Sequence, residues 1–249
     1  MERTVGVVIP AYAPPVGALE DYVHAAVGIM DPDAIRIELD APRPGTEERL
    51  EALPATVAVS QVRRGKGAAV SAGFDALDSD VLVMLDADGS TPVSGAIRLL
   101  EPIRTGDAAI AVGSRRHPDA TVRGSQSMTR RYLGGGFAWC ARRILEPSLY
   151  DYQCGAKAIS RHAWETTRDH LQEEGFGWDV ELLAVSDALG IPIAEVPLEW
   201  YDADGSTVST VGTSLDLARA VVRARRNAAR LRRRPLGGAA TSGAATSQR

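Results

Sequence analysis

Cysteine, lysine and long apolar segments are scarce in this sequence. Cys140 and Cys154 are its only cysteines, and Lys66 and Lys157 are its only lysines among 28 basic residues. No apolar run approaches the roughly 18 residues that a membrane-spanning helix needs, and no charged-then-apolar leader opens the chain. We therefore expect a cytoplasmic protein in a reducing compartment, with no disulfide between its two cysteines.

Acidic and basic residues are unevenly distributed along the chain. Its net charge is −4, but nine of the 28 basic residues lie in 216–249, where Asp216 is the only acid. The preceding residues therefore hold 19 basic and 31 acidic side chains. An acidic body argues against nucleic acid as a partner, whereas a basic end suits an anionic surface.

Apolar runs alternate with helical patterns through most of the sequence. The five apolar residues Val81–Leu85 are typical of a strand buried on both faces of a sheet. Expected strands at 5–10, 35–39, 57–61, 81–85, 108–113, 156–160 and 193–200 alternate with expected helices at 16–30, 68–77, 137–145, 161–171 and 179–189. This alternation predicts a single-domain, Rossmann-like α/β fold with a mostly parallel central sheet flanked by helices.

The last part of the chain differs from this body. We expect one domain over 1–214, followed by a basic amphipathic helix over 215–234. Residues 235–249 contain almost no large apolar side chain and are rich in glycine, alanine, serine and threonine. Because such a composition cannot build a core, we expect this tail to be disordered.

Two carboxylates follow the buried strand Val81–Leu85. Asp86 and Asp88 stand in the run Asp-Ala-Asp-Gly, and ligands of open α/β sheets bind beyond the carboxyl ends of the strands. Side-chain alternation would point both carboxylates to one side, where they can hold Mg²⁺ or Mn²⁺ against a diphosphate. The competing interpretation is a solvated turn or a helix cap, which is common for aspartate.

Two further loops offer contacts to a nucleotide. Pro10, Ala11 and Tyr12 end the first strand, where the tyrosine ring could support a base or ribose, or else pack in the core. The run Gly65-Lys66-Gly67 opens a helix, and a helix start of this kind favours an anion such as a diphosphate. The Walker spacing is absent, so an ordinary glycine-rich helix start is the alternative.

An arginine cluster follows the strand expected at 108–113. Arg115 and Arg116 come directly after this strand, and Arg123, Arg130 and Arg131 stand in the loop beyond. Because guanidinium groups match phosphate geometry, the cluster suits a phosphate-bearing acceptor. A solvated basic face is the alternative.

The order of these motifs resembles a known family, the inverting nucleotide-sugar glycosyltransferases with the A-type fold. The similar runs are Val8-Ile9-Pro10-Ala11-Tyr12, Gly65-Lys66-Gly67, Leu85-Asp86-Ala87-Asp88-Gly89 and Gly113-Ser114-Arg115. The runs that resemble its dolichyl-phosphate glucosyltransferase and mannosyltransferase branch are Asp151-Tyr152-Gln153-Cys154-Gly155-Ala156-Lys157 and Trp178-Asp179-Val180-Glu181-Leu182-Leu183. The resemblance extends from about Val5 to Thr207.

The resemblance implies a role for each of these residues. A metal ion, Mg or Mn, would be held by Asp86 and Asp88. The nucleotide-sugar pocket would be lined by Pro10, Ala11, Tyr12, Asp40, Lys66, Gly67 and Asp86. The phosphate of a polyprenyl (dolichyl) phosphate acceptor would be held by Arg115 and Arg131. Two positions depart from the family pattern: relatives often have two consecutive acids where this chain has Leu39-Asp40, and a lysine where it has Thr207.

The expected catalytic residues are Asp88 and Asp179. In an inverting transfer, the acceptor attacks the anomeric carbon opposite the departing diphosphate. A sugar hydroxyl as acceptor would need a general base, and Asp179 or Glu181 could serve. A phosphate monoester with a second pKa of about 6 is already anionic at neutral pH, so Asp179 would then orient the reacting groups. The alternative is that Asp179 only caps a helix.

The helix expected at 215–234 has one apolar and one basic face. The apolar residues are Leu217, Val221, Ala224, Ala228 and Leu231, and the basic ones are Arg219, Arg223, Arg226, Arg230 and Arg233. Such a helix can make a peripheral contact with an anionic membrane. Its apolar face can instead dock on the domain or on a partner helix.

Two other functions remain open on the sequence alone. A sugar-1-phosphate nucleotidyltransferase also combines an α/β sheet, a metal and a glycine-rich loop. Its glycine-rich signature would follow the first strand, however, where this chain has Ala11-Tyr12-Ala13-Pro14-Pro15. The second alternative is a non-catalytic module that binds a nucleotide sugar.

Overall fold

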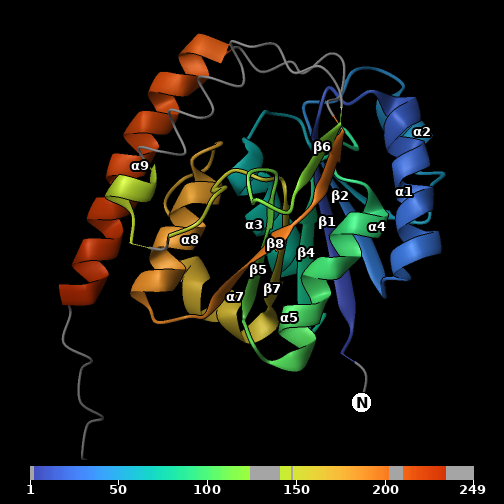
Figure 1. The fold of residues 1–249 in the computed structure, drawn as a ribbon. Helices are drawn as coiled ribbons and strands as arrows, with labels where there is room; N and C mark the ends of the chain where they lie inside the picture. The colour runs from blue at the N-terminus through green and yellow to red at the C-terminus, as the bar shows by residue number, and fades with distance from the viewer. Residues whose placement is uncertain (1–2, 124–140, 147, 202–209, 234–249) are drawn as a thin grey trace, which may run out of the picture.

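A computed structural model describes residues 3–123, 141–146, 148–201 and 210–233, with only the backbone for 210–215. At its centre is a seven-stranded sheet (Figure 1). In spatial order its strands are β3 (Thr56–Ser60), β2 (Ala34–Asp40), β1 (Val5–Tyr12), β4 (Val81–Leu85), β7 (Ala156–Ser160), β5 (Ile110–Ser114) and β8 (Ile193–Pro197). Strand β7 runs antiparallel to both neighbours, and the other pairs of described neighbours are parallel. The predicted α/β class and mostly parallel sheet are confirmed.

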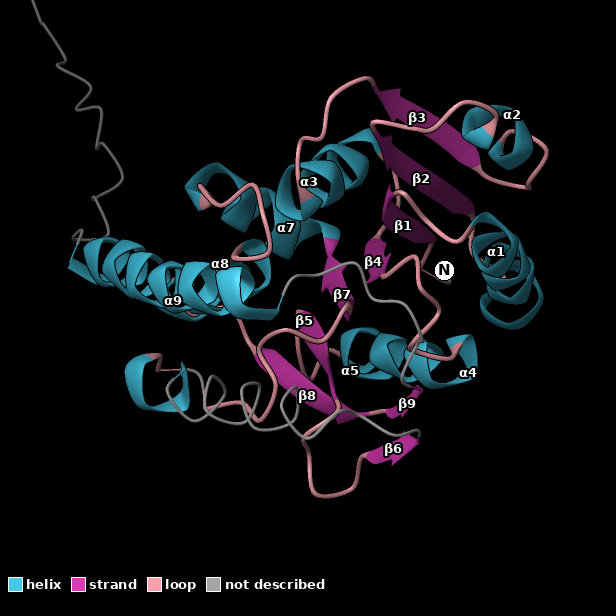
Figure 2. Cartoon of the chain, turned by 90° about the horizontal axis from the view of Figure 1, so that it is seen from above, coloured by secondary structure: helices cyan, strands magenta, loops and turns pink. Residues whose placement is uncertain are grey.

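Helices cover both faces of this sheet (Figure 2). One face carries α1 (Val16–Met30), α2 (Thr46–Leu50), α4 (Val93–Ala96) and α5 (Leu100–Thr105), and the other carries α3 (Lys66–Ala76), α7 (Arg161–Thr167), α8 (Trp178–Ala188) and α9 (Thr210–Arg233). Strand β4 divides its side chains between two cores. Val83 and Leu85 belong to the first cluster, whereas Leu82 and Met84 belong to the second. This is the double burial that its unbroken apolar run predicts.

The sheet changes its winding direction between β1 and β4. These strands are neighbours, yet α1 follows β1 on one face and α3 precedes β4 on the other. In open α/β sheets, ligands bind beyond the carboxyl ends of the strands at such a point. We call the edge of the sheet at the carboxyl ends of these two strands, where the chain continues from Tyr12 and from Leu85, the β1/β4 edge.

The first strand is longer than the sequence predicts. It continues through Pro10 and pairs with β2 as far as Tyr12, which lies opposite Asp40. Its ladder with β4 ends at Val8. Beyond Val8 the strand pairs with β2 alone. A strand that is unpaired on one side tolerates proline, which has no N–H to donate. The loop therefore begins at Ala13, whose φ is 46°.

The last expected strand divides into two. Residues 193–200 form β8 and, after a break at Leu198, β9 (Glu199–Tyr201). Strand β9 pairs with β6 (Thr121–Arg123), a short strand inside the stretch that was expected to be a basic loop. Pro197 has no N–H to donate, which favours the exit of the chain from the first sheet at that point.

Helix α9 lies alongside α8 (Figures 1 and 2). Its residues Val221, Ala224 and Ala228 belong to the second core cluster. Of the partners expected for its apolar face, the structure shows the domain itself. The expected 137–145 helix is described only from Ala141, and none of the described helices is apolar over a length that would cross a bilayer.

Candidate functional site

The two lysines of the chain meet at one carboxylate. Nζ of Lys66 lies 2.9 Å from Oδ2 of Asp179, and Nζ of Lys157 lies 2.6 Å from Oδ1 of the same residue. Lys66 also lies 3.0 Å from Oδ1 of Asp86. The side chains of Lys157, Asp179, Lys66 and Asp86 are 2%, 3%, 11% and 31% exposed. They form a row of alternating charge from the interior to the β1/β4 edge, which we call the charged row.

Four elements bring the charged row together. Lys157 lies on β7, Lys66 opens α3, Asp179 is the second residue of α8, and Asp86 follows β4. A close approach at Gly155 makes this possible, because a Cβ there would lie 1.6 Å from Oδ2 of Asp86. The N–H of Asp86 donates to the carbonyl oxygen of Gly155 at 3.1 Å. Glycine at this position is therefore a requirement of the site.

Asp179 is held as an anion. Burial acts to raise its pKa, but Lys157 and Lys66 outweigh burial and hold the pKa of this carboxyl below its usual range. Each of its oxygens accepts from an ammonium group, which makes it a weak proton acceptor. The N-cap of α8 is Gly177, so Asp179 does not cap the helix.

Asp86 and Asp88 lie near one buried phenol. The hydroxyl of Tyr22 donates to the carbonyl oxygen of Thr91 at 2.6 Å. Burial raises the pKa of Tyr22 far above its usual value, and the charges of Asp86 and Asp88 raise it further. Both carboxylates thus act on the pKa of the same hydroxyl.

A turn, and not strand alternation, arranges these two carboxylates. Strand β4 ends at Leu85, so Asp86 and Asp88 lie beyond it. The Oδ1 atom of Asp88 accepts the N–H of Ser90 at 2.9 Å, and Gly89 adopts a φ of 67°. The expected alternation is therefore wrong as a mechanism. Asp88 is exposed at this turn.

The turn offers a cation two carboxylates. Among the residues that the structure describes, no group of three or more His, Cys, Asp or Glu side chains could hold a metal ion. Asp86 and Asp88 fit an ion such as Mg²⁺, which commonly takes one or two carboxylates and completes its shell with substrate phosphates and water. A metal cage built by these protein residues alone does not fit.

Gly65 and Gly67 are required by neighbouring backbone. Gly65 has a φ of 103°, and a Cβ there would lie 2.6 Å from the carbonyl oxygen of Glu174. A Cβ at Gly67 would lie 2.5 Å from the carbonyl oxygen of Glu173. Contact with the loop before α8 thus accounts for the glycine at 67, which was expected to contact the nucleotide sugar. Between the two glycines, Lys66 is held in place.

Tyr12 presents its ring at the end of β1. The residue is 44% exposed, and the guanidinium carbon of Arg63 lies 4.1 Å from the ring centroid. The alternative that Tyr12 packs in the core is therefore wrong. Ala11 does belong to the first core cluster, and Pro10 is half-buried. Of these three residues, Tyr12 is the one with an open side chain.

Asp40 holds the turn that leads to Lys66. Its Oδ2 atom accepts the backbone N–H groups of Arg64 and Gly65 at 2.8 and 3.0 Å. Its Oδ1 atom accepts Nε of Arg64 at 2.8 Å. Asp40 lies opposite Tyr12 in the sheet register, beside the place expected for the base. Its buried carboxylate already has three protein partners.

Arg115 forms a bidentate ion pair with Asp151. Its Nε lies 2.6 Å from Oδ2, and one terminal nitrogen lies 2.9 Å from Oδ1. Burial opposes ionisation of Asp151, but Arg115 holds the pKa of this carboxyl well below its usual range. The guanidinium carbon also lies 4.8 Å from the ring centroid of Trp200. A phosphate at Arg115 would therefore share a guanidinium that is already paired.

Arg116 differs from its neighbour. No carboxylate within the described ranges forms an ion pair with it. Burial lowers the pKa of its guanidinium and the charge of Arg115 lowers it too, against the opposing effect of Asp151. The hydroxyl oxygen of Ser114 accepts the N–H groups of Arg116 and His117 at 3.3 and 3.0 Å, which fixes the turn after β5.

Glu181 supports the structure. Its Oε2 atom accepts the N–H groups of Gln172 and Glu173, both at 2.7 Å. Its Oε1 atom accepts from the amide nitrogen of Asn227 at 2.8 Å. Because these bonds occupy both oxygens, nothing in this geometry supports Glu181 as a general base.

The sequence analysis also named residues that the structure does not describe or that lie outside the charged row. Arg131, Arg130, Thr207 and Cys140 lie outside the described residues. Arg123 pairs with Glu199 at 2.6 Å. Cys154 is a free, buried thiol, and burial is the main cause that raises its pKa to about 11.

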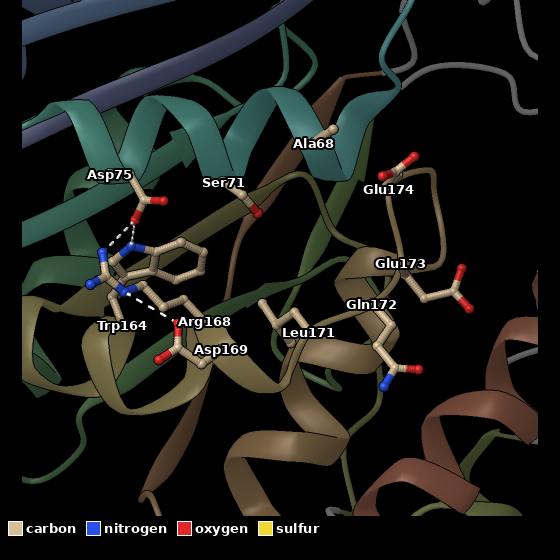
Figure 3. A pocket seen from close by; sticks show the side chains of 10 residues that line it. All are labelled: Ala68, Ser71, Asp75, Trp164, Arg168, Asp169, Leu171, Gln172, Glu173 and Glu174. Carbon is tan, nitrogen blue, oxygen red and sulfur yellow. Dashed lines mark hydrogen bonds and ion pairs between the residues drawn. The ribbon is translucent and has the colours of Figure 1, made fainter.

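A separate cavity of about 440 Å³ lies between α3 and the loop before α8 (Figure 3). Ser71 and Asp75 face it from α3, and Leu171 and Gln172 face it from the loop. Asp86, Asp88, Asp179 and Lys66 do not line it. The cavity is therefore distinct from the charged row.

Comparison with known proteins assigns a family profile to most of the chain. Residues 7–166 match Glycosyl transferase family 2. Glycosyltransferase AglD of Haloferax volcanii is 32% identical over 164 residues, which are 66% of this chain and 26% of that protein. A dolichyl-phosphate beta-glucosyltransferase of Mus musculus is 36% identical over 149 residues, which are 57% of this chain and 46% of that protein. The chain thus spans about half the length, or less, of these curated relatives.

Solved structures share the fold. Glucosyl-3-phosphoglycerate synthase from Mycobacterium tuberculosis, crystallised with Mn²⁺ and UDP-glucose, has a TM-score of 0.69 at 24% identity, covering 90% of this chain and 79% of that chain. The complex of the same synthase with phosphoglyceric acid has a TM-score of 0.71 at 22% identity, with 90% and 80% covered. The predicted A-type glycosyltransferase fold is confirmed.

The sequence prediction gave Lys157 no role, although a signal was present. The chain uses arginine for every basic residue except Lys66 and Lys157. A compact ammonium and a planar guanidinium are not interchangeable at a buried site. In this arginine-rich chain, both lysines pair with the single carboxylate of Asp179.

Proposed function

Because the chain belongs to glycosyl transferase family 2, we propose that it moves a hexose from a nucleotide sugar to a polyprenyl phosphate with inversion at the anomeric carbon. The donor is of the UDP-glucose or GDP-mannose type, and the acceptor is of the dolichyl-phosphate type. Curated relatives named dolichyl-phosphate beta-glucosyltransferase support this acceptor and favour glucose as the sugar.

The state of Asp179 is the observation that carries this proposal. A sugar hydroxyl as acceptor needs a base, but both oxygens of Asp179 are paired with lysines, which lower its pKa and make it a weak base. A phosphate monoester has a second pKa of about 6 and attacks without a base. The pairing therefore supports a phosphate acceptor, with Asp179 as an orienting group that holds Lys66.

On the donor side, we assign the diphosphate to Lys66 and to a divalent cation that Asp86 and Asp88 would hold, and the base and ribose to the side of Tyr12 and Asp40. A bound Mg²⁺ or Mn²⁺ would neutralise charge as the diphosphate departs. The similar synthase crystallised with Mn²⁺ and UDP-glucose supports both the metal and this donor class. Lys66 contributes a point charge from within the protein.

On the acceptor side, we assign the phosphate to Arg116 together with Arg131. Arg115 and Asp151 brace the turn from which Arg116 extends. A guanidinium without a carboxylate partner in the described part of the chain is available to an anion, and arginine binds phosphate with two parallel bonds. The proposal keeps Arg115 as a secondary contact.

We also assign a peripheral membrane contact to the outer face of α9, at the cytoplasmic side of a membrane. Arg225, Arg226, Arg230 and Arg233 are exposed there, and no acid in the described ranges pairs with them. Each such residue contributes about 1 kcal/mol near an anionic surface. Co-sedimentation with phosphatidylglycerol vesicles should exceed that with phosphatidylcholine, and a quadruple Arg→Gln variant should lose the difference. Equal sedimentation of parent and variant would remove this assignment.

Donor recognition tests the proposal and separates an enzyme from a binding module. UDP-glucose or GDP-mannose should raise the melting temperature of the chain when Mn²⁺ is present, because a ligand that binds only the folded state stabilises it. Slow release of free hexose should accompany binding. Binding without any turnover would favour the non-catalytic module, and no shift with either donor would overturn the proposal.

A further inference from the structure

We infer that helix α9 positions the donor site through the loop at 171–177, with Arg223 and Asn227 as positioning residues. The inference deepens the proposed function, and its nucleotide arm rests on that function. Three observations carry it: the contacts of the loop with the start of α3, its contacts with α8 and α9, and the cavity that borders the loop.

The loop holds the first turn of α3. The N–H of Ala68 donates to the carbonyl oxygen of Glu174 at 3.0 Å. The glycine positions on either side of Lys66 lie against the same loop, since a Cβ at Gly67 would meet the carbonyl oxygen of Glu173 at 2.5 Å. The place of Lys66 between its two carboxylates therefore depends on where the loop lies.

Asn227 ties the loop to α9. Its amide nitrogen donates to the carbonyl oxygen of His170 and to Oε1 of Glu181, both at 2.8 Å. Glu181 in turn accepts the N–H groups of Gln172 and Glu173. Asn227 is buried, and a buried bond to a charged group contributes more than an ordinary one.

Arg223 makes a second tie to the loop. Its guanidinium donates to both carboxylate oxygens of Glu173, with a distance of 2.9 Å to Oε2. Close packing adds to this contact, because a Cβ at Gly177 would lie 2.7 Å from Cβ of Ala220. Helix α9 therefore contacts His170 just before the loop, Glu173 in its middle and Gly177 at its end.

The other side of the loop has less support. Leu171, Gln172, Glu173 and Glu174 border the cavity of about 440 Å³ described above (Figure 3). Where a loop faces a cavity, it loses the contacts that a packed neighbour would supply. The position of this loop depends accordingly on its bonds to α8 and α9.

These contacts form one path from α9 to the charged row. Displacement of α9 would release Glu173 and the carbonyl oxygens beside it, then the first turn of α3, and with that turn Lys66. The helix expected as a separate membrane element is thereby also a support of the donor site. The exposed arginines of α9 serve the proposed membrane contact, whereas Arg223 and Asn227 hold the loop.

Hydrogen exchange on the intact chain without lipid tests the path. In Arg223→Gln, amides in segments 64–69 and 171–177 should exchange about threefold faster, in line with the weakness of a partly exposed ion pair. In Asn227→Leu they should exchange about tenfold faster, because bonds to a buried carboxylate are stronger. The matched control is Arg219→Gln, which breaks an arginine pair with Asp216 that stays within α9. Unchanged exchange in Arg223→Gln, whose exposed site permits folding, would overturn the inference.

Calorimetric titration with UDP and Mn²⁺ gives the second arm. Arg223→Gln and Asn227→Leu should bind UDP about three- and tenfold more weakly than the parent, following the same estimates, whereas Arg219→Gln should match the parent. Faster exchange with unchanged UDP affinity would also overturn the positioning role. If the parent itself binds no UDP or GDP, the proposed function fails, and the exchange arm still decides the path.

Discussion

Lys157 places its ammonium nitrogen 2.6 Å from Oδ1 of Asp179, and both side chains are almost completely buried. The same nitrogen donates to the carbonyl oxygen of Cys154 at 2.6 Å. Asp179 thus has one lysine on the interior side and Lys66 on the side of the β1/β4 edge. The inner lysine fixes the carboxylate that fixes the outer one.

Substitution of Lys157 should therefore affect both stability and transfer. Lys157→Met leaves a buried carboxylate with one partner fewer, so we expect a loss of about 3 kcal/mol in the free energy of unfolding. Urea denaturation measures this loss. Lys157→Arg serves as the charge-conserving control, and its larger planar group should also fail to restore transfer. Parent-like stability and transfer in Lys157→Met would show that the charged row is not needed.

Asp88→Asn should abolish transfer while the fold stays intact. The asparagine side chain keeps an oxygen that can accept the N–H of Ser90, and the position is exposed, so the turn should persist. A metal ligand is worth several kcal/mol in the transition state, so the rate should fall at least about hundredfold. Circular dichroism checks the fold, and initial rates with and without Mn²⁺ check the effect. Metal-dependent transfer at the parental rate would refute the metal assignment.

The two neighbouring arginines should respond differently to the same change. Arg115→Gln leaves Asp151 buried without its partner, so we expect a loss of about 3 kcal/mol in stability. Arg116→Gln should leave stability within about 0.5 kcal/mol, as is usual away from such pairs. It should raise the KM for the phosphate acceptor about tenfold or more, because it removes a charge-assisted contact. An unchanged acceptor KM in Arg116→Gln would show that another residue binds the acceptor phosphate.

Stability should fall in acid through Asp151. The pKa of this carboxyl is depressed in the folded protein, so its contribution is fully present above the unfolded value of about 3.9 and is lost as pH falls toward the folded value. Urea midpoints from pH 7 to pH 3 should decline in the parent. Asp151→Asn should be less stable at pH 7 and decline less steeply. If the urea midpoints of the parent and of Asp151→Asn fell equally between pH 7 and pH 3, the pair with Arg115 would make no such contribution.

Cys154 should resist thiol reagents in the folded protein. Burial raises its pKa to about 11, so almost no thiolate forms at pH 8, and the side chain has no exposed surface. Iodoacetamide followed by peptide mass spectrometry should find Cys154 unmodified until urea is added. Rapid native labelling would show that this part of the site opens readily.

The strands of this fold could be predicted because their signal is local. The unbroken apolar run Val81–Leu85 reports burial on both faces wherever the strand lies in the sheet. The extension of β1 beyond Pro10, to Tyr12, could not be predicted in the same way. It depends on the fact that the ladder with β4 ends at Val8, and this is a property of the neighbouring strand.

The motifs of the candidate site can be recognised in the sequence, but the side-chain pairings within it could not be predicted. Asp86 and Asp179 stand in recognisable motifs, whereas the partners of Arg115 and Asp40 lie 36 and 24 residues away in the chain. No period or spacing reports such contacts. The sequence also could not show why residue 67 is a glycine, because the reason is close contact with the loop around Glu173, which is distant in the chain.

Transfer of labelled glucose from UDP-glucose tests the central claim most directly, with a short polyprenyl phosphate and the matching polyprenol offered as acceptors in detergent with Mn²⁺. The account predicts label on the polyprenyl phosphate, none on the alcohol, and loss of labelling in Asp88→Asn. Equal labelling of the alcohol would contradict it, because that reaction needs a base which the lysine-paired Asp179 does not provide.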